Sequence, residues 1–408
     1  MKKSYLLSII LIISLIYSCG ENDKKYDIIP LKKLNSEKTG IDFYNEILPN
    51  LETQENLFDY DYFYNGSGVG IADINNDGLK DILFCANQKP NKLYLNKGNL
   101  KFEDISELSN INSKNKKWSS GVTFADVNND GWLDIYISQG GPYKSEYRKN
   151  LLLINNQNLT FSDKAEEYGL ADIGISTQSA FFDFDKDGDL DCIVMNENEF
   201  YGYDPVSFFK KFNNEKVLIN NSSHLYEQIE GDFVNVTEKA GLLGPTFGLG
   251  LCVSDVNNDN WPDIYIANDY FVKDAMYINN QDGTFSNKIK ESTKQISFFG
   301  MGVDIEDINN DNLSDIFVLD MASSDHVRSK TLMASMNTSN FDLITNKLDQ
   351  HYQYMFNSLQ LNLGNNKYHN ISHQLNMAKT DWSWAGLIFD YNLDGNEDIF
   401  VTNGYRKY

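Results

Sequence analysis

The sequence has little of what several classes of protein require. It has 7 prolines, 5 histidines and 4 cysteines in 408 residues, too few for a proline-rich linker or a dense disulfide framework. It contains no His-Glu-x-x-His, no Gly-x-Ser-x-Gly and no phosphate-binding loop. Lys and Arg together number 35 against 58 Asp and Glu, which gives a net charge of −23. This excess of negative charge disfavours nucleic acids and anionic lipid surfaces as partners.

Apolar runs long enough to cross a membrane are also lacking. Lys2 and Lys3 precede an apolar stretch at residues 6–16, which is shorter than the about 20 residues of a spanning helix. The segment from Ile16 to Gly20 (Ile-Tyr-Ser-Cys-Gly) resembles a bacterial lipobox. We therefore expect residues 1–18 to be a lipoprotein signal peptide, Cys19 to receive lipid and residues 19–40 to form a flexible tether. The alternative is a secretory signal with an incidental cysteine.

The three remaining cysteines, Cys85, Cys192 and Cys252, each lie in an apolar run. They form no Cys-x-x-Cys pair and have no neighbouring histidine cluster, which disfavours a zinc site. Buried, unpaired thiols in strands are the prediction.

What the sequence does contain is an internal repeat. A Gly-rich apolar run, an acidic loop of the form Asp-x-Asn/Asp-x-Asp-x-x-x-Asp and a second apolar run recur six times. The loops begin 53, 57, 72, 52 and 83 residues apart, at Asp73, Asp126, Asp183, Asp255, Asp307 and Asp390. A weaker Asn-x-Leu-Tyr-like hairpin motif follows most copies, for example at residues 91–96 with Phe102 behind it.

Each repeat is therefore predicted to form about four short strands. The strands after the acidic loops, such as residues 82–85 and 264–267, are almost continuously apolar, which indicates burial on both faces. Stacked blades around an axis bury strands in this way, and about 50 residues suit one blade. The predicted fold is an all-β propeller over residues 41–408, with six or, as a truncated form, seven blades. The insert from Met321 to Met355 has the clearest helical signal.

The acidic loops predict calcium sites. Positions 1, 3, 5 and 9 offer side-chain oxygens and position 7 offers a backbone carbonyl, and calcium prefers six to eight hard oxygen ligands. Position 6 is Gly in four loops and Asn260 or Asn312 in the other two, which suits a left-handed backbone. Flanking strands and the missing Glu at position 12 exclude an EF-hand. We expect up to six Ca²⁺ ions.

The predicted metal ligands are these residues: Asp73, Asn75, Asp77, Leu79 and Asp81; Asp126, Asn128, Asp130, Trp132 and Asp134; Asp183, Asp185, Asp187, Asp189 and Asp191; Asp255, Asn257, Asp259, Trp261 and Asp263; Asp307, Asn309, Asp311, Leu313 and Asp315; Asp390, Asn392, Asp394, Asn396 and Asp398.

The repeat resembles the FG-GAP/VCBS repeats of integrin α-chain propellers, and the chain is similar to bacterial lipoproteins related to cartilage acidic protein. The resemblance rests on the six loops, on residues 64–70 (Tyr-Asn-Gly-Ser-Gly-Val-Gly), on residues 381–385 (Asp-Trp-Ser-Trp-Ala) and on residues 403–406 (Asn-Gly-Tyr-Arg). Such relatives usually continue into further repeats and an ASPIC/UnbV domain. We expect residues 41–47 to close the ring as an outer strand of the last blade.

Three functions are compatible with this pattern. The first is a non-enzymatic binding or adhesion module of the cell envelope, lipid-anchored, with the outer membrane as the expected location and a protein or glycan as ligand. The second is an accessory lipoprotein for glycan or nutrient capture in an uptake system. The third is a propeller polysaccharide lyase or hydrolase, for which no nucleophile–base pair stands out. Residues 198–212 and the Met321–Met355 insert are the candidate ligand-binding loops, with ordered caps over a blade edge as the alternative.

Overall fold

The computed structural model describes residues 31–112, 118–331 and 338–404. The chain divides into two compact units, residues 34–391 with 395–408, and residues 1–33 with 392–394. In the smaller unit, the described residues 31–33 and 392–394 contain no helix or strand. The described helices and strands all lie in the larger unit. Within the described ranges, no helix is both long and apolar enough to cross a bilayer.

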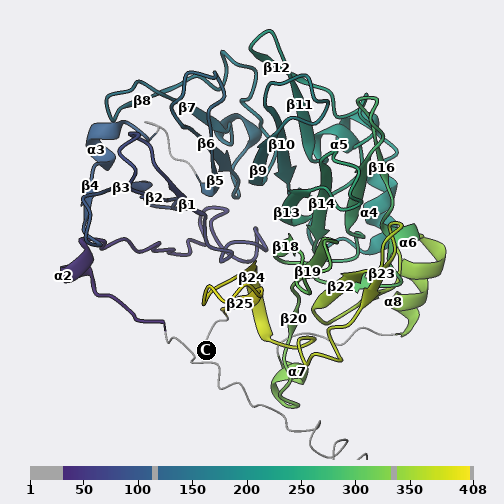
Figure 1. Ribbon diagram of the computed structural model, residues 1–408. Coiled ribbons are helices and arrows are strands. Elements are labelled where there is room, and N and C mark those ends of the chain that lie inside the picture. The colour runs from purple at the N-terminus through teal and green to yellow at the C-terminus, as the bar shows by residue number, and fades with distance from the viewer. Residues whose placement is uncertain (1–30, 113–117, 332–337, 405–408) are drawn as a thin grey trace, which may run out of the picture. The chain divides into compact units, whose positions relative to one another are not determined.

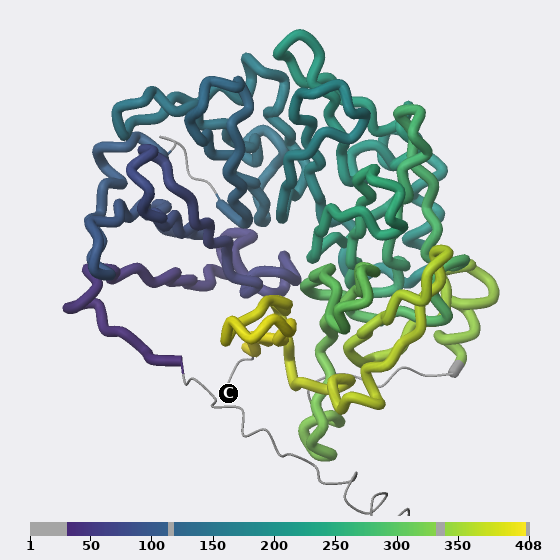
Figure 2. The backbone as a smooth tube through the Cα atoms, viewed as in Figure 1, coloured from purple at the N-terminus to yellow at the C-terminus, as the bar shows by residue number. Residues whose placement is uncertain are grey.

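Five four-stranded antiparallel sheets follow one another along the chain and around a central axis (Figures 1 and 2). The first two contain β1 (Val69–Ala72), β2 (Asp81–Phe84), β3 (Lys92–Asn96) and β4 (Phe102–Asp104), then β5 (Ser119–Ala125), β6 (Asp134–Gln139), β7 (Leu151–Asn155) and β8 (Phe161–Asp163). The third and fourth contain β9 (Ser176–Phe182), β10 (Asp191–Asn196), β11 (His224–Ile229) and β12 (Asp232–Asn235), then β13 (Gly248–Ser254), β14 (Asp263–Asn268), β15 (Ala275–Asn279) and β16 (Phe285–Asn287). The fifth contains β18 (Val303–Glu306), β19 (Asp315–Val318), β22 (Ser358–Asn362) and β23 (Tyr368–Asn370).

The sixth blade has fewer strands than the other five. Its strands are β24 (Asp381–Phe389) and β25 (Asp398–Asn403), and the two-residue β20 (Met321–Ala322) pairs with the start of β24. The predicted six-repeat propeller is thus confirmed, with five four-stranded blades and a three-stranded sixth.

The second strands form the core, as predicted from their apolar runs. All six residues of β14 are buried, because one face packs on the preceding blade and the other on the following blade. Burying both faces of a strand requires the near-continuous apolar sequence seen here. A separate apolar cluster fills each interface between successive blades, beginning with the interface of the first and second blades and ending with that of the fifth and sixth.

Glycines in the first strands allow these strands to come close near the axis. A Cβ atom on Gly121 would lie 2.4 Å from the Thr177 carbonyl oxygen, and one on Gly250 would lie 2.6 Å from that of Met301. Both contacts are shorter than atoms tolerate. The Gly-rich apolar run of the repeat is therefore a packing requirement of the narrow centre of the propeller.

The predicted role of residues 41–47 in closing the ring is wrong. These residues form no strand and lie against the first blade. The Phe43 ring stacks on Phe84 with 4.8 Å between centroids, and the Tyr94 hydroxyl donates to Asp42 at 2.8 Å. The segment therefore packs on the aromatic side chains of the first blade and does not pair with the edge of the sixth.

Helical turns connect and flank the blades. They are α2 (Ser36–Thr39), α3 (Ser106–Ser109), α4 (Pro205–Lys211), α5 (Glu215–Asn220), α6 (Ile289–Ser292), α7 (Arg328–Thr331) and α8 (Thr338–Asp342), with a 3-10 turn, η1 (Ser145–Tyr147), and a π turn, η2 (Leu343–Lys347). The short parallel pair of β17 (Ile296–Ser297) and β21 (Gln353–Tyr354) joins the fifth blade to its insert. The helical prediction for residues 321–355 is confirmed only as short turns, and the helices α4 and α5 were not predicted.

Candidate metal-binding loops

Each acidic loop joins the first strand of a blade to the second, so the loops lie at the same end of their sheets. The fourth loop shows the arrangement. Asp255 Oδ1 accepts from the Asp259 N–H at 3.0 Å, and its Oδ2 accepts from the Asn260 N–H at 2.7 Å. Asp259 Oδ1 in turn accepts from the Trp261 N–H at 2.8 Å. The same bonds recur in the first, second and fifth loops. The backbone therefore holds the acids at positions 1 and 5 beside each other.

In the first five blades, the aspartate at position 9 ties the loop to the rest of its blade. In the fourth blade, Asp263 Oδ2 accepts from the Val256 N–H at 3.1 Å and Oδ1 accepts from the Asn279 N–H at the end of β15 at 2.8 Å. Asp81, Asp134, Asp191 and Asp315 make the corresponding pair of bonds. Burial raises the pKa of Asp263 to about 7, although both backbone bonds oppose the shift. Each carboxylate oxygen has a second lone pair that could serve a metal.

Two residues in every loop adopt a left-handed backbone. The prediction at position 6 is confirmed, with φ of 83° at Gly78 and 65° and 66° at Asn260 and Asn312. Position 4 has the same conformation, for example φ of 57° at Asn76 and 60° at Asn258, and this was not predicted. Four of the six loops have asparagine at position 4, and asparagine is the residue after glycine that most readily adopts this region, whereas Lys186 and Leu393 in the other two loops give no such signal.

The third loop is the most acidic. Carboxylate oxygens of Asp183, Asp185 and Asp187 lie within 4.8 Å of one another, a spacing that could hold a metal ion. Asp183 Oδ1 and Asp189 Oδ1 are buried and have no hydrogen-bond partner among the described residues. Burial, followed by the charge of Asp187, raises the pKa of Asp189 to about 6. Buried oxygens without a donor are costly unless a cation or water satisfies them.

Neighbouring loops are also connected. The Asn76 side-chain amide donates to the Gly131 carbonyl of the next loop at 3.0 Å, and Asn258 donates to the Asn312 carbonyl at 2.7 Å. Between the third and fourth loops the Lys186 ammonium lies 4.5 Å from the centre of the Trp261 ring instead. These contacts link the first loop to the second, the third loop to the fourth, and the fourth loop to the fifth.

The sixth repeat retains part of this pattern. The Gly395 N–H donates to Asp390 Oδ2 at 2.8 Å, and the Tyr391 N–H donates to Asp398 Oδ2 at 3.2 Å. The hairpin that supplies the second donor to position 9 in the other blades does not follow β25 within the described residues.

The cysteines singled out in the sequence were the other predicted residues. Cys85 and Cys192 are buried, Cys252 is half-buried, and all three thiols are free, as predicted. Cys19 and the signal peptide lie outside the described residues.

Of the two candidate ligand-binding loops, residues 198–212 pack as a cap. Phe208 is fully buried, its ring stacks on Phe247 at 5.2 Å, and it meets Phe271 edge to face at 5.0 Å. The ordered-cap alternative therefore describes this tract.

Comparison with known proteins agrees with this architecture. The family model for the FG-GAP-like repeat matches residues 73–137 and 255–318. Cartilage acidic protein 1 from Xenopus tropicalis is 33% identical over 133 residues, which cover 32% of this chain and 20% of the relative. Integrin alpha-8 from Gallus gallus is 33% identical over 106 residues, covering 23% and 10%. The chain thus aligns with a fifth or less of the length of these relatives.

Among solved structures, one match is a lectin from Agrocybe aegerita that is described as recognising non-reducing terminal N-acetylglucosamine. The alignment covers 82% of this chain and 73% of the lectin chain. Its TM-score is 0.45 and its sequence identity 15%. The matched repeats coincide with acidic loops and their flanking strands in the blades described above. The chain is a six-bladed β-propeller that contains FG-GAP-like repeats at residues 73–137 and 255–318, and part of it is homologous to cartilage acidic protein 1 and integrin alpha-8.

Proposed function

We propose that this protein is a non-enzymatic, calcium-binding lipoprotein of the cell envelope that acts as a binding or adhesion module. The pair of buried, unpartnered oxygens on Asp183 and Asp189 is the observation that supports calcium most directly. Both residues belong to the loop in which carboxylate oxygens of Asp183, Asp185 and Asp187 converge. An all-oxygen donor set suits Ca²⁺ better than a transition metal.

Calcium would act as a structural ion in this proposal. The loops join the first two strands of each blade, and in the first five blades the position-9 aspartates also hold the third strand, as Asp263 does. An ion bound there would neutralise acids that otherwise repel one another, and it would stabilise the folded chain by mass action. Ligands at positions 1, 3 and 5 would hold the ion, with up to six ions for the whole chain.

The binding role rests on the scaffold and on its relatives. A rigid propeller presents loops whose positions are fixed by the blades, and such loops are where binding usually resides. A protein or a glycan at the cell surface is the expected ligand. The lipid on Cys19 would tether the propeller to the outer membrane, and residues 20–40 would let it reach a partner.

Calcium binding is tested by isothermal titration of the full chain, purified in detergent after treatment with chelator. The proposal predicts several bound Ca²⁺ ions per chain, and fewer in Asp183→Asn/Asp187→Asn, with Asp282→Asn on an exposed hairpin turn as the matched control. Heat that does not saturate, or equal stoichiometry in all three proteins, would contradict it.

The anchor is tested by growing cells that express the protein with an alkyne-labelled fatty acid. The label should appear on the wild-type protein and be lost in Cys19→Ala. Cys85→Ala controls for a general effect of removing a thiol. Equal labelling of Cys19→Ala would reject the lipid anchor without affecting the calcium proposal.

A further inference from the structure

A cavity of about 320 Å³ lies on the axis of the propeller. Every blade contributes to its wall from its first strand or from the residues that lead into it. The contributing residues include Gly68, Gly121, Thr177, Leu249, Met301 and Ala385. Its volume is at the lower end of the roughly 300–1,000 Å³ that small-molecule sites occupy.

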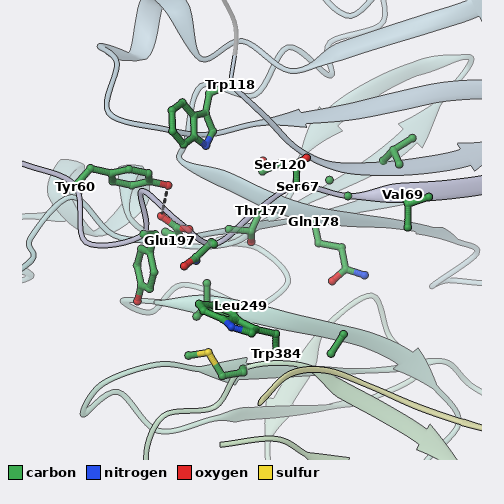
Figure 3. A pocket seen from close by; sticks show the side chains of 18 residues that line it. Tyr60, Ser67, Val69, Trp118, Ser120, Thr177, Gln178, Glu197, Leu249 and Trp384 are labelled. Carbon is green, nitrogen blue, oxygen red and sulfur yellow. Dashed lines mark hydrogen bonds between the residues drawn. The ribbon is translucent and has the colours of Figure 1, made fainter. Parts of the chain in front are cut away.

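Aromatic rings flank the cavity on two sides. Trp118 lies on one side, Trp384 lies on the opposite side, and Glu197 and Gln178 lie between them (Figure 3). Tyr60 and Tyr62 extend the first side. Their hydroxyls are already bonded, since Tyr60 donates to Glu197 at 3.1 Å and Tyr62 donates to Asp269 at 2.9 Å. These bonds fix the two rings in place.

Polar side chains that are free to bind a ligand complete the wall of the cavity. The Gln178 side chain is exposed in the cavity, and the Asn65 side chain is half-buried there. Neither side-chain amide makes a hydrogen bond to another described residue, so each offers both a donor and an acceptor. The hydroxyl of Thr177 donates to the Gly248 carbonyl at 2.9 Å, which leaves its lone pairs as acceptors.

The charge of the cavity restricts the ligand. No Lys, Arg or His is among its lining residues, all of which the structure describes. Glu197 is its one acidic side chain and is 3% exposed. Burial raises its pKa to about 8, against the hydrogen bonds from Tyr60 and Tyr201, which lower it. The wall is therefore close to neutral at pH 7 and has no partner for an anion.

We propose that this cavity binds a neutral saccharide, as a single pyranose or as the end of a chain. A pyranose has apolar C–H faces that suit Trp118 and Trp384, and hydroxyls around its edge that suit Gln178 and Asn65. Two segments that stand out in the sequence apart from the acidic loops, residues 64–70 and 381–385, contribute to this wall. The inference rests on the proposed binding function and gives it a ligand class.

The test uses the full chain in detergent with millimolar calcium and a panel of methyl glycosides of neutral hexoses and N-acetylhexosamines. Saturation-transfer NMR identifies a bound sugar, and calorimetric titration gives its Kd. Loss of one hydrogen bond in Gln178→Ala should weaken binding about five- to tenfold. Trp384→Phe keeps an aromatic ring of smaller area and should also weaken it. Gln374→Ala, at an exposed site away from the cavity, should leave Kd unchanged.

Two results would overturn the proposal. No saturation transfer to any glycoside from a folded wild-type protein would do so, as would binding that Gln178→Ala and Trp384→Phe leave unaltered. A site that prefers tetramethylammonium to every sugar would overturn the ligand class. The calcium titration of the same sample is independent of these readouts, so a failed sugar site and a failed calcium proposal are distinguishable.

Discussion

The fifth and sixth blades have similar inner strands but different surroundings. Phe317 in β19 and Phe400 in β25 occupy the same position of the repeat, two residues after the last aspartate of the loop. Phe317 is 0% exposed, because the sixth blade packs on it, whereas Phe400 is 41% exposed. On the same face of the sixth blade Leu387 and Phe389 are also exposed. Burial in a propeller is therefore set by the neighbouring blade as much as by the sequence of the repeat.

The largest expected effect comes from replacing these two phenylalanines. Phe317→Ala should lower the free energy of unfolding by about 3–5 kcal/mol, because it removes a large buried side chain and leaves a cavity. Phe400→Ala should lower it by less than about 1 kcal/mol, in line with an exposed site. Chemical denaturation of both variants beside wild type measures the difference, and equal losses would mean that the sixth blade is as well packed as the fifth.

Ion pairs give a second contrast between blades. In the third blade His224 binds Asp172, and the Tyr226 hydroxyl donates to the same carboxylate at 2.7 Å. In the sixth blade Arg328 binds Asp381 at 2.8 Å, with both side chains 40% exposed. His224→Gln should lower the free energy of unfolding by about 3 kcal/mol, because it leaves the buried Asp172 carboxylate without its partner. Arg328→Gln should lower it by less than about 1 kcal/mol. Similar losses of stability in the two variants, measured by chemical denaturation, would contradict the expected difference between the buried and the exposed ion pair.

The His224 pair also has a pH dependence. Burial lowers the pKa of His224, but the charge and hydrogen bond of Asp172 outweigh it and raise the pKa to about 9. A histidine whose folded pKa exceeds its unfolded value of about 6.5 stabilises the fold fully below that value and loses this contribution as pH rises toward 9. Wild type should therefore lose stability between pH 7 and 9 more steeply than His224→Gln. Parallel curves would show that the pair does not titrate in this range.

A smaller effect is expected at position 9 of the loops. Asp263→Asn in the fourth blade should cost about 1–3 kcal/mol, because an amide nitrogen would face a buried backbone N–H. Asp398→Asn should cost less, since only the Tyr391 N–H donates to Asp398 among its described neighbours. Thermal melts of the two variants make the comparison, and a larger loss for Asp398→Asn would contradict the anchoring role.

The smallest effect should come from the links between loops. Asn258→Ala removes the bond to the Asn312 carbonyl and places alanine at a φ of 60°, for a cost of about 1–2 kcal/mol. Asn258→Gly removes the same bond without the backbone strain and should cost less. Thermal melts of both variants measure the difference. A glycine variant less stable than the alanine variant would contradict the expected strain at this position.

Much of the fold could be predicted from the sequence because the repeat is local. The acidic loop, the apolar run after it and the hairpin each depend on neighbouring residues. The fourth strand of the first blade in fact begins at Phe102, the residue that follows the predicted hairpin. The position of residues 41–47 could not be predicted in this way. Their resemblance to a strand was local, whereas their position depends on Phe84 and Tyr94, which are distant in sequence.

The candidate sites, too, could be predicted only where a local sequence pattern marks them. The loop acids were found because their spacing is regular, and the left-handed position 4 could have been found from its asparagines in four of the six loops. The axial cavity could not, because Trp118, Gln178 and Trp384 come from three blades and share no sequence motif. A site assembled by packing of repeats becomes visible only in three dimensions.

One measurement tests the central claim most directly: a thermal melt of the full chain, first with millimolar calcium and then with excess chelator. Each loop that is filled at ten times its Kd adds about 1.4 kcal/mol, so several loops together should raise Tm well above that of the chelated protein. Magnesium at the same concentration should reproduce little of the rise. An identical Tm with calcium and with chelator would mean that the loops do not bind the ion, and calcium binding would be contradicted.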